Sequence, residues 1–390
     1  MLQHLYEAGC QITLVAPRGL ALESWKPFTD RIFSWNPPVC NWAGGPLYST
    51  YAFEASWDRF FYNFIDFLLL PARLNSAYQI IKTELVRGRF DVVYVNSLAL
   101  FPLAGMLATS KSQYGFRLIW QIREVLNEKL AGIVYSSIAR SVARAADRVV
   151  GISSVEAKAF QPYGSVDILH NSVSPTWERP ANWPGFVPGP LRVAMAGAYR
   201  PSKGVGEFIR MAELVAARVS DAEFFLFSPH PIPLRYHNLF DWVGRLLSIF
   251  SEKLATSLNL VKNLSGAVIK NTVNLTFDHP LSYDDYRRIT VYVRSDNSGS
   301  PWGRDVIEAM WAGVPVVATG TIQEFVLDGE TGFLVPPGNA EMLAERVACL
   351  LQDPALRCRM AEAAYQRAGM LFDPYQYGQC IREIFGLEPS

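Results

Sequence analysis

Short apolar runs rich in β-branched residues alternate along this chain with longer segments whose apolar residues recur at helical spacing. In the first half, four runs are typical of buried parallel strands, at residues 11–16, 90–96, 117–122 and 148–152. Three segments between them have the helical pattern, at residues 76–87, 98–109 and 133–146. Strands that alternate with helices predict a doubly wound α/β domain.

The alternation breaks after residue 171 and later starts again. Residues 172–190 hold five prolines together with Trp177, Trp183 and Phe186, a composition that indicates a connection between domains. Further strands are expected at 191–196, 223–227, 273–277 and 291–294, with helices at 204–217, 283–289, 340–351 and 354–370. We therefore expect a first domain over residues 1–172, a linker over 173–190 and a second domain over 191–370, with 371–390 packing back on the first domain.

The start of the first domain departs from this pattern. A doubly wound domain normally opens with a strand and a glycine-rich turn, whereas residues 1–9 already have the pattern of a first helix. The strand expected before that helix would lie centrally in the sheet. We therefore expect the first strand of the N-terminal domain to be missing from this sequence, through truncation or a misassigned start codon.

Two further segments, Trp57–Leu70 and Leu239–Leu254, place large apolar side chains on one helical face. The second lies within residues 229–270, which we interpret as an insertion into the strand–helix–strand order. Each segment is either an ordinary helix that faces the core or a helix that inserts shallowly into a membrane surface.

Composition narrows the possible partners. The 36 basic and 36 acidic residues give a net charge of zero, which argues against nucleic-acid binding driven by bulk electrostatics. The five cysteines are scattered without a Cys-x-x-Cys pair and the five histidines lack metal-binding spacing, which argues against disulfides and zinc. These features predict a cytoplasmic protein without a bound metal, and association with the inner face of the plasma membrane stays open.

The candidate residues with the clearest chemistry lie near residue 303. Gly303 opens a short helix, and Glu308 lies one turn inside it, where a carboxylate can accept hydrogen bonds from both hydroxyls of a ribose. The N–H groups at the start of this helix can bind a phosphate. Arg304 either adds charge at that point or is an exposed helix arginine, and Asp305 is either a ligand contact or a first-turn helix charge.

Two further turns follow predicted strands of the second domain, at the edge where α/β proteins bind nucleotides. The turn at 196–204 contains Gly197 and two cations, Arg200 and Lys203. Each cation either stabilises the negative charge of a departing diphosphate or is a solvated side chain at a helix start. The other turn contacts a base or diphosphate, or is a plain turn. It consists of Thr319, Gly320 and Thr321.

Together these segments resemble the donor-binding region of the family 4 retaining glycosyltransferases, which have the GT-B fold of two Rossmann-like domains facing each other across a cleft. The resemblance is carried by Glu308 with the Ala-Met-Trp-Ala-Gly that follows it, and by the Gly-Glu-Thr-Gly-Phe-Leu-Val-Pro of residues 329–336. Lys203 falls on the lysine of the family's glycine-rich turn.

The sequence departs from the family at two positions of the second domain. Ala198 stands where the family has an arginine, and Arg200, two residues on, is a candidate to replace that charge. Ser300 stands where the family has the first of two glutamates, which contacts the donor sugar. Asp296 and Asp305 are the candidates to replace it.

In the first domain, Arg123 and Glu124 follow the strand predicted at 117–122. Many family members have a histidine–aspartate pair at this point, with the histidine facing the donor sugar. Residues at the carboxyl end of a parallel strand lie at the binding edge. Arg123 and Glu124 therefore either orient donor or acceptor hydroxyls or form a structural ion pair.

The resemblance implies an enzyme that moves a sugar from a nucleoside-diphosphate sugar to a glycan or lipid-linked acceptor, with retention of configuration. It implies no metal and no cofactor besides the nucleotide sugar as co-substrate, and no nucleic-acid partner. Ala198 and Ser300 keep open a non-catalytic GT-B subunit that binds a sugar nucleotide or a partner protein. An epimerase or phosphorylase is disfavoured because neither acid–base carboxylates nor a pyridoxal lysine motif is recognisable.

Overall fold

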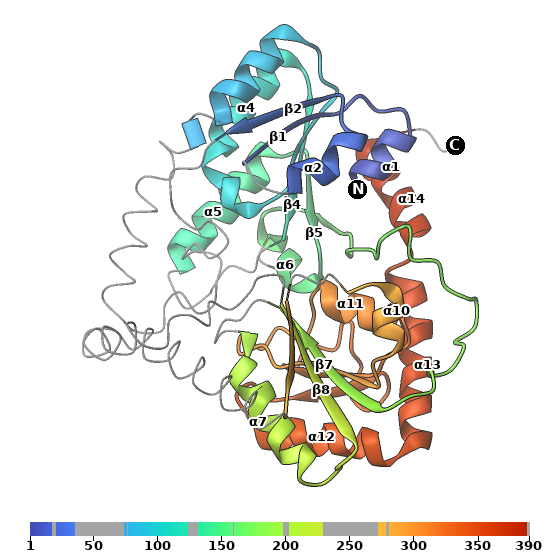
Figure 1. Ribbon diagram of the computed structural model, residues 1–390. Helices are drawn as coiled ribbons and strands as arrows, with labels where there is room; N and C mark the ends of the chain where they lie inside the picture. The colour runs from blue at the N-terminus through green and yellow to red at the C-terminus, as the bar shows by residue number, and fades with distance from the viewer. Residues whose placement is uncertain are drawn as a thin grey trace, which may run out of the picture. The chain divides into compact units, whose positions relative to one another are not determined.

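The computed structural model of the chain describes residues 1–17, 21–35, 74–75, 77–123, 132–158, 160–197, 203–228, 272–277 and 281–387. These residues form two compact units (Figure 1). Unit 1 comprises Met1–Asn171 and Tyr375–Ser390, and unit 2 comprises Ser172–Pro374. Several sequence predictions fall outside the described residues, namely those for Trp57–Leu70, Leu239–Leu254, Glu124, Ala198 and Arg200.

Unit 1 contains a four-stranded parallel sheet and a separate two-stranded parallel sheet. The larger sheet has its strands in chain order, β3 (Val92–Val95), β4 (Arg117–Ile122), β5 (Arg148–Gly151) and β6 (Val166–Ile168). The smaller sheet pairs β1 (Thr13–Pro17) with β2 (Arg31–Trp35). Because all neighbours are parallel, the carboxyl ends of β3 to β6 lie at one edge of their sheet.

Strand β4 shows how the larger sheet is buried on both faces, since successive side chains of a strand point to opposite sides. Leu118 and Trp120 join one apolar cluster with two helices, α4 (Ala104–Tyr114) and α5 (Gly132–Ala145). Ile119 joins a second cluster with α1 (Leu2–Glu7) and the last helix, α14 (Pro374–Phe385). The C-terminal segment therefore packs within unit 1.

The remaining helical elements of unit 1 are short, apart from a helix over residues 77–87. They are α2 (Ala21–Trp25), η1 (Lys26–Phe28), η3 (Leu98–Leu103), α6 (Ser154–Lys158) and η5 (Gln161–Tyr163). Among the residues that the structure describes, no helix is long and apolar enough to cross a membrane.

Unit 2 is built on a six-stranded parallel sheet. Its strands lie in the spatial order β12 (Gly332–Val335), β11 (Val316–Thr319), β10 (Val291–Arg294), β7 (Leu191–Ala196), β8 (Ala222–Ser228) and β9 (Asn274–Phe277). The chain leaves β7 toward β8 on one side and later returns to β10 on the other. This reversal creates a switch point between β7 and β10, where doubly wound folds bind ligands beyond the carboxyl ends of the strands.

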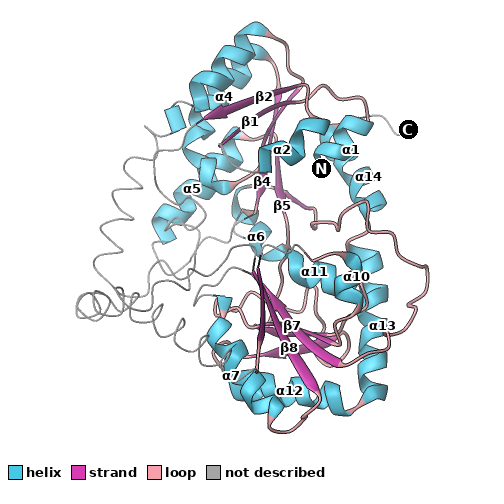
Figure 2. Cartoon of the chain, viewed as in Figure 1, coloured by secondary structure: helices cyan, strands magenta, loops and turns pink. Residues whose placement is uncertain are grey.

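Helices flank the sheet of unit 2 (Figure 2). On one face, α7 (Val205–Ala216) and α12 (Ala340–Gln352) pack with Val193, Val291 and Val293 in one apolar cluster. The other helices among the described residues of this unit are α10 (Tyr283–Arg287), α11 (Arg304–Trp311) and α13 (Pro354–Leu371). The parallel α/β fold predicted from the sequence is confirmed, whereas β2, β6 and α14 are elements that the hydrophobic pattern does not predict.

The proline-rich segment predicted as a linker belongs to unit 2 in the structure. Its Arg179 lies between two aromatic rings, with the guanidinium carbon 3.9 Å from the ring centroid of Trp311 and 4.0 Å from that of Tyr365. Arg179 Nη1 also donates a hydrogen bond of 2.7 Å to the Tyr365 carbonyl. Trp183 lies so close to Gly313 that a side chain at residue 313 would overlap its indole ring.

Candidate functional site

The predicted donor-binding residues of unit 2 follow three neighbouring strands. Gly197 and Lys203 follow β7, Gly303 to Glu308 follow β10, and Gly320 follows β11. Since β11, β10 and β7 are adjacent and parallel, their carboxyl ends lie at one edge of the sheet. The topology therefore brings these segments together at the switch point between β7 and β10.

The end of β10 determines which side chains meet at this edge. Val291 and Val293 point into the apolar cluster with α7 and α12. Alternation along the strand places Tyr292 and Arg294 on the opposite face, and both contact Asp305 in the first turn of α11. An arginine in a buried strand needs acceptors for its donors and charge, because an unpaired buried charge is costly.

Arg294 is the centre of a buried ionic network. Its side chain is only 12% exposed, and Nη1 donates to Oδ1 of Asp305 at 2.8 Å and to Oδ2 at 3.0 Å. Nη2 donates to Asp296 Oδ2 at 3.2 Å, and Nε donates to the Ser300 carbonyl at 2.9 Å. Although burial alone would lower the pKa of the Arg294 guanidinium, Asp305 and Asp296 raise that pKa above its ordinary value.

Lys203 joins the network from the β7–α7 turn. Its Nζ donates to Asp296 Oδ2 at 2.8 Å, and its side chain is 42% exposed whereas that of Asp296 is 4% exposed. The second Asp296 oxygen accepts hydrogen bonds from the backbone N–H and the hydroxyl of Ser298. Burial alone would raise the pKa of the Asp296 carboxyl, but Arg294 and Lys203 hold it below its usual range. Of the two cations, Lys203 is thus the one that solvent or a ligand can reach.

The β7–α7 turn is also held by direct backbone packing against β10. Ser295 Oγ donates a hydrogen bond of 2.7 Å to the Gly204 carbonyl. Gly204 has φ of +70°, and a side chain there would overlap the Ser295 carbonyl. On the other side of the turn, the Ala196 N–H donates to the Tyr292 hydroxyl at 2.9 Å, and that hydroxyl donates to Asp305 Oδ2 at 2.9 Å.

Glu308 lies where the sequence predicts a ribose contact, one turn inside α11. Arg304 Nε donates to its Oε1 at 2.8 Å, and the Tyr286 hydroxyl donates to its Oε2 at 3.2 Å. Glu308 is 14% exposed and Arg304 is 72% exposed, so the arginine can turn into solvent and uncover one carboxylate oxygen. Burial raises the pKa of the Glu308 carboxyl, and the contacts with Arg304 and Tyr286 offset this only in part.

Three other predicted donor residues make contacts within the protein. Both oxygens of Asp305 accept hydrogen bonds from Arg294 or Tyr292, which favours the structural alternative for this residue. The Thr319 hydroxyl donates to the Asp296 carbonyl at 2.5 Å. A side chain at Gly303 would overlap both Arg294 and Asp305. The glycine there leaves room for the ion pair, a reason independent of any phosphate.

The remaining predictions for unit 2 concern two glycines and a threonine. Gly197 has φ of +151°, and a Cβ added to it would meet no atom within 4 Å among the residues that the structure describes. Gly320 has φ of +135°, and a side chain there would overlap the Gly299 carbonyl. Its N–H donates to the Val335 carbonyl at 2.8 Å, which holds the turn against β12. Thr321 is exposed.

In unit 1, Arg123 follows β4 and is exposed. Its charge acts to lower the pKa of two partly buried phenols, Tyr94 in β3 and Tyr377 in α14, against the larger effect of burial. Burial raises the pKa of Tyr377 to about 12, so this phenol stays protonated as a hydrogen-bond donor. The Tyr94 hydroxyl donates to the side-chain carbonyl of Gln121.

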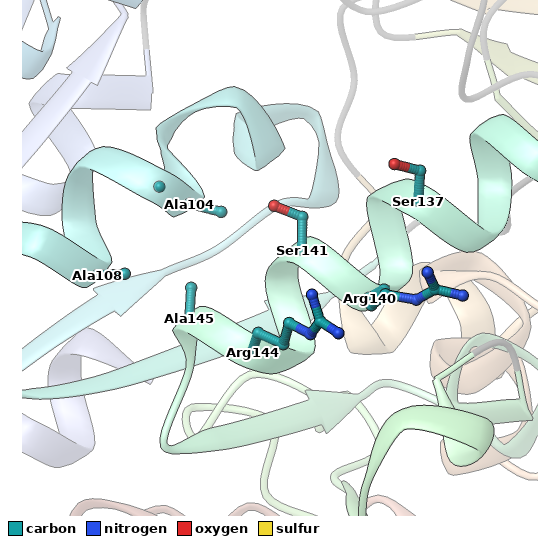
Figure 3. A pocket seen from close by; sticks show the side chains of 8 residues that line it. Ala104, Ala108, Ser137, Arg140, Ser141, Arg144 and Ala145 are labelled. Carbon is teal, nitrogen blue, oxygen red and sulfur yellow. The ribbon is translucent and has the colours of Figure 1, made fainter.

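A cavity of about 400 Å³ lies elsewhere in unit 1, between α4 and α5. Figure 3 shows Ser137, Arg140, Ser141 and Arg144 along α5, with Ala104 and Ala108 on α4. Gly105 and Ala145 complete its lining, and none of the lining residues is a predicted site residue. Within the described part of the chain, no group of three or more His, Cys, Asp or Glu side chains is placed to hold a metal ion.

Sequence reasoning overlooked Tyr292, Arg294 and Ser295, which hold the three loops of the site. The available signal was the residue pattern of β10, Val-Tyr-Val-Arg. Its alternation puts an arginine on a buried face, where carboxylates must lie near it. The sequence suggests Asp296 and Asp305 for contact with the donor sugar, and the structure places both against this arginine.

Residues 263–367 match the protein family described as Glycosyl transferases group 1. The lipopolysaccharide core biosynthesis glycosyltransferase LpsE of Rhizobium meliloti is 36% identical over 136 residues, which are 34% of this chain and 40% of LpsE. The phosphatidyl-myo-inositol mannosyltransferase of Mycobacterium leprae is 38% identical over 79 residues, 20% of this chain and 21% of that protein. The matches to these curated relatives thus span less than half of their length.

Similarity over the whole chain is structural. The crystal structure of Anabaena HepE in complex with UDP and glucose has a TM-score of 0.66 and 16% identity, covering 99% of this chain and 94% of that one. At such identity the likeness establishes the fold. The chain has the GT-B fold, and residues 263–367 of its second unit match the group 1 glycosyltransferase family.

Proposed function

We propose that this protein transfers a sugar from a nucleoside-diphosphate sugar to a hydroxyl of a glycan or lipid-linked acceptor, with retention of configuration and without a metal ion. The observation that carries the proposal is the placement of Lys203 and Glu308 after two adjacent parallel strands, β7 and β10, at the switch point of unit 2. Lys203 offers a half-exposed ammonium beside the turn after β7. Glu308 offers a carboxylate on the helix after β10. An ammonium can bind a diphosphate through its charge, and a carboxylate can accept hydrogen bonds from the hydroxyls of a ribose.

The two residues act on different parts of the donor. Glu308 accepts hydrogen bonds from the ribose hydroxyls once Arg304 has turned away from Oε1. Lys203 and the N–H groups at the start of α11 bind the diphosphate, whose negative charge grows as the bond to the sugar breaks. In that step the bond between the anomeric carbon and the phosphate oxygen breaks, and the acceptor oxygen bonds to the same carbon on the same face. A phosphate oxygen takes the acceptor's proton.

Known proteins support the choice of substrates. LpsE is described as a glycosyltransferase of lipopolysaccharide core biosynthesis, and HepE has been crystallised with UDP-glucose. We therefore propose a cell-surface polysaccharide or lipid-linked glycan as the acceptor, with the enzyme in the cytoplasm near the inner face of the plasma membrane. UDP-glucose is the first donor to test.

A panel of nucleotide sugars tested by thermal shift examines the binding half of the proposal. A ligand present at about 100 times its dissociation constant stabilises the folded protein by about 2.7 kcal/mol, which gives a clear rise in melting temperature. No shift with any nucleotide sugar or nucleoside diphosphate would contradict the proposal.

The donors that bind are then assayed for hydrolysis and for transfer, with and without EDTA. Release of the nucleoside diphosphate would exclude the non-catalytic subunit, whereas binding without turnover would favour it. NMR of the anomeric proton of the product tests retention, and loss of activity in EDTA would contradict a metal-independent reaction.

A further inference from the structure

We propose that Arg294 is a positioning residue of the donor site, whose buried guanidinium neutralises Asp296 and Asp305 so that the Lys203 ammonium is available to a nucleoside diphosphate. This inference rests on the proposed function, because it assumes that the site binds such a ligand. It assigns a role to a residue that lies beneath the site and does not itself reach the ligand.

The contacts of Arg294 place it in this role. Each of its three nitrogens already has an acceptor, Nε on the Ser300 carbonyl, Nη1 on Asp305 and Nη2 on Asp296. A ligand would have to displace a carboxylate to bind this guanidinium. Lys203 makes its ion pair with Asp296 alone among the residues that the structure describes, and its side chain is the more exposed of the two cations.

The charges of the network explain why Lys203 needs Arg294. Two carboxylates, Asp296 and Asp305, face two cations, so the network is neutral when all four groups are ionised. Without Arg294, Lys203 would be the remaining cation of a network that holds two carboxylates, and the network would carry one net negative charge. Because like charges repel strongly in a site of low dielectric, a diphosphate would then bind poorly.

Arg294 also fixes the geometry of two loops. Its bond to the Ser300 carbonyl holds the loop after β10, and its bonds to Asp305 hold the first turn of α11. Tyr292 extends this connection from Asp305 to the Ala196 N–H at the end of β7. The guanidinium therefore sets the distance between the helix start and the lysine turn, the two parts that a diphosphate would bridge.

Variants that change the net charge of the network distinguish a positioning role of Arg294 from a merely structural one. Arg294→Met removes the cation and leaves the network with an excess negative charge. Arg294→Met combined with Asp305→Asn removes one charge of each sign and restores neutrality, without restoring any hydrogen bond that Arg294 made. Arg294→Lys keeps the charge but loses the forked geometry. Arg357→Met, a change in an arginine that bonds the Leu350 and Leu351 carbonyls, is the matched control.

The experiment measures binding of UDP and GDP by calorimetry, with uridine and guanosine as probes that lack the phosphates. We expect Arg294→Met to weaken nucleoside-diphosphate binding at least about tenfold, while nucleoside binding changes by less than about threefold. The double variant should recover most of the lost affinity, and Arg357→Met should leave it unchanged. The deficit of the single variant should shrink at high salt, since screening weakens the repulsion.

Two results would overturn the inference in a protein that binds UDP or GDP. The first is an Arg294→Met variant that binds UDP or GDP as tightly as the wild-type protein does. The other is an equal loss for nucleosides and nucleoside diphosphates that the double variant does not recover, which would indicate a structural role. If Arg294→Met does not fold, Arg294→Lys and the double variant decide, because both keep the network neutral and should bind more tightly than Lys203→Ala. Failure of the wild-type protein to bind any nucleoside diphosphate would instead refute the proposed function.

Discussion

Two partly buried arginines of unit 2 have opposite electrostatic surroundings. Arg179 lies between the rings of Trp311 and Tyr365 and donates to a backbone carbonyl, and burial lowers its pKa. Arg294 is surrounded by carboxylates, which raise its pKa in spite of burial. Carbonyls and rings satisfy an arginine without adding charge, so they suit a residue that only attaches a segment. Carboxylates couple an arginine to the charge of the neighbouring site.

The largest expected difference between the two arginines is in the stability of the protein after each is replaced. Arg294→Met leaves Asp296 and Asp305 buried with one cation, and breaking a buried ion pair from one side costs about 3–5 kcal/mol in the free energy of unfolding. Arg179→Met leaves no uncompensated charge and should cost about 1–3 kcal/mol through lost hydrogen bonds and packing. Urea unfolding of the two variants measures both values. Equal costs would show that the carboxylates do not distinguish the two arginines.

Removal of Lys203 sharpens the comparison at the exposed end of the network. Lys203→Ala should lower turnover about 100-fold, the usual order for loss of one preorganised group that stabilises transition-state charge. Donor affinity should fall less, because the diphosphate gains charge as the sugar leaves. Steady-state kinetics combined with donor binding measures the two effects. A variant with wild-type turnover would exclude Lys203 from the reaction.

Glu308 provides a carboxylate outside the Arg294 network. Glu308→Gln should weaken donor binding by about 1.5–3 kcal/mol, the usual value of a hydrogen bond that involves a charged group. The loss should be seen for uridine as well as UDP, which distinguishes it from the loss in Arg294→Met. Calorimetry with both ligands tests this, and unchanged affinity in a folded variant would remove Glu308 from the ribose contact.

The smallest expected effect is a pH shift. Ribose binding needs the Glu308 carboxylate, whose pKa is raised by burial, so uridine affinity should fall on acidification at a higher pH than for an ordinary glutamate. Arg304 lowers this pKa through its charge and hydrogen bond, and Arg304→Ala should therefore move the midpoint to still higher pH. Uridine titrations across an acidic pH series locate both midpoints. A midpoint that does not move would show that Arg304 leaves Glu308 before the ligand binds.

Local patterns were sufficient for the strands and for the position of Lys203 and Glu308. Strands β4, β7 and β10 are mostly apolar runs with one or two polar residues each, and their bounds agree with the prediction. β2 and β6 are short and mix polar with apolar residues, as in Val-Asp-Ile of β6, so neither gives a clear period. The prolines of residues 173–190 indicate a connection, but the contacts that attach it to unit 2 depend on Trp311 and Tyr365, far along the chain.

The role of Arg294 could not be derived from sequence spacing alone. Asp305 lies eleven residues further on, and the two meet because the intervening loop returns the chain to the face of β10 on which Tyr292 and Arg294 point. Gly303 illustrates the same limit, since a glycine at a helix start suggests a phosphate site. In the folded chain the same glycine also makes room for an ion pair.

The glycines of the donor site also limit how its substrate choice can be engineered. A side chain at Gly204 or Gly320 would overlap the backbone of the neighbouring loop, and one at Gly303 would displace the Arg294–Asp305 ion pair, so substitution at these positions should destabilise the protein. Arg304 and Thr321 are exposed beside them and can change without repacking. A combinatorial library that seeks a new nucleotide or sugar preference should vary these two residues and keep all three glycines.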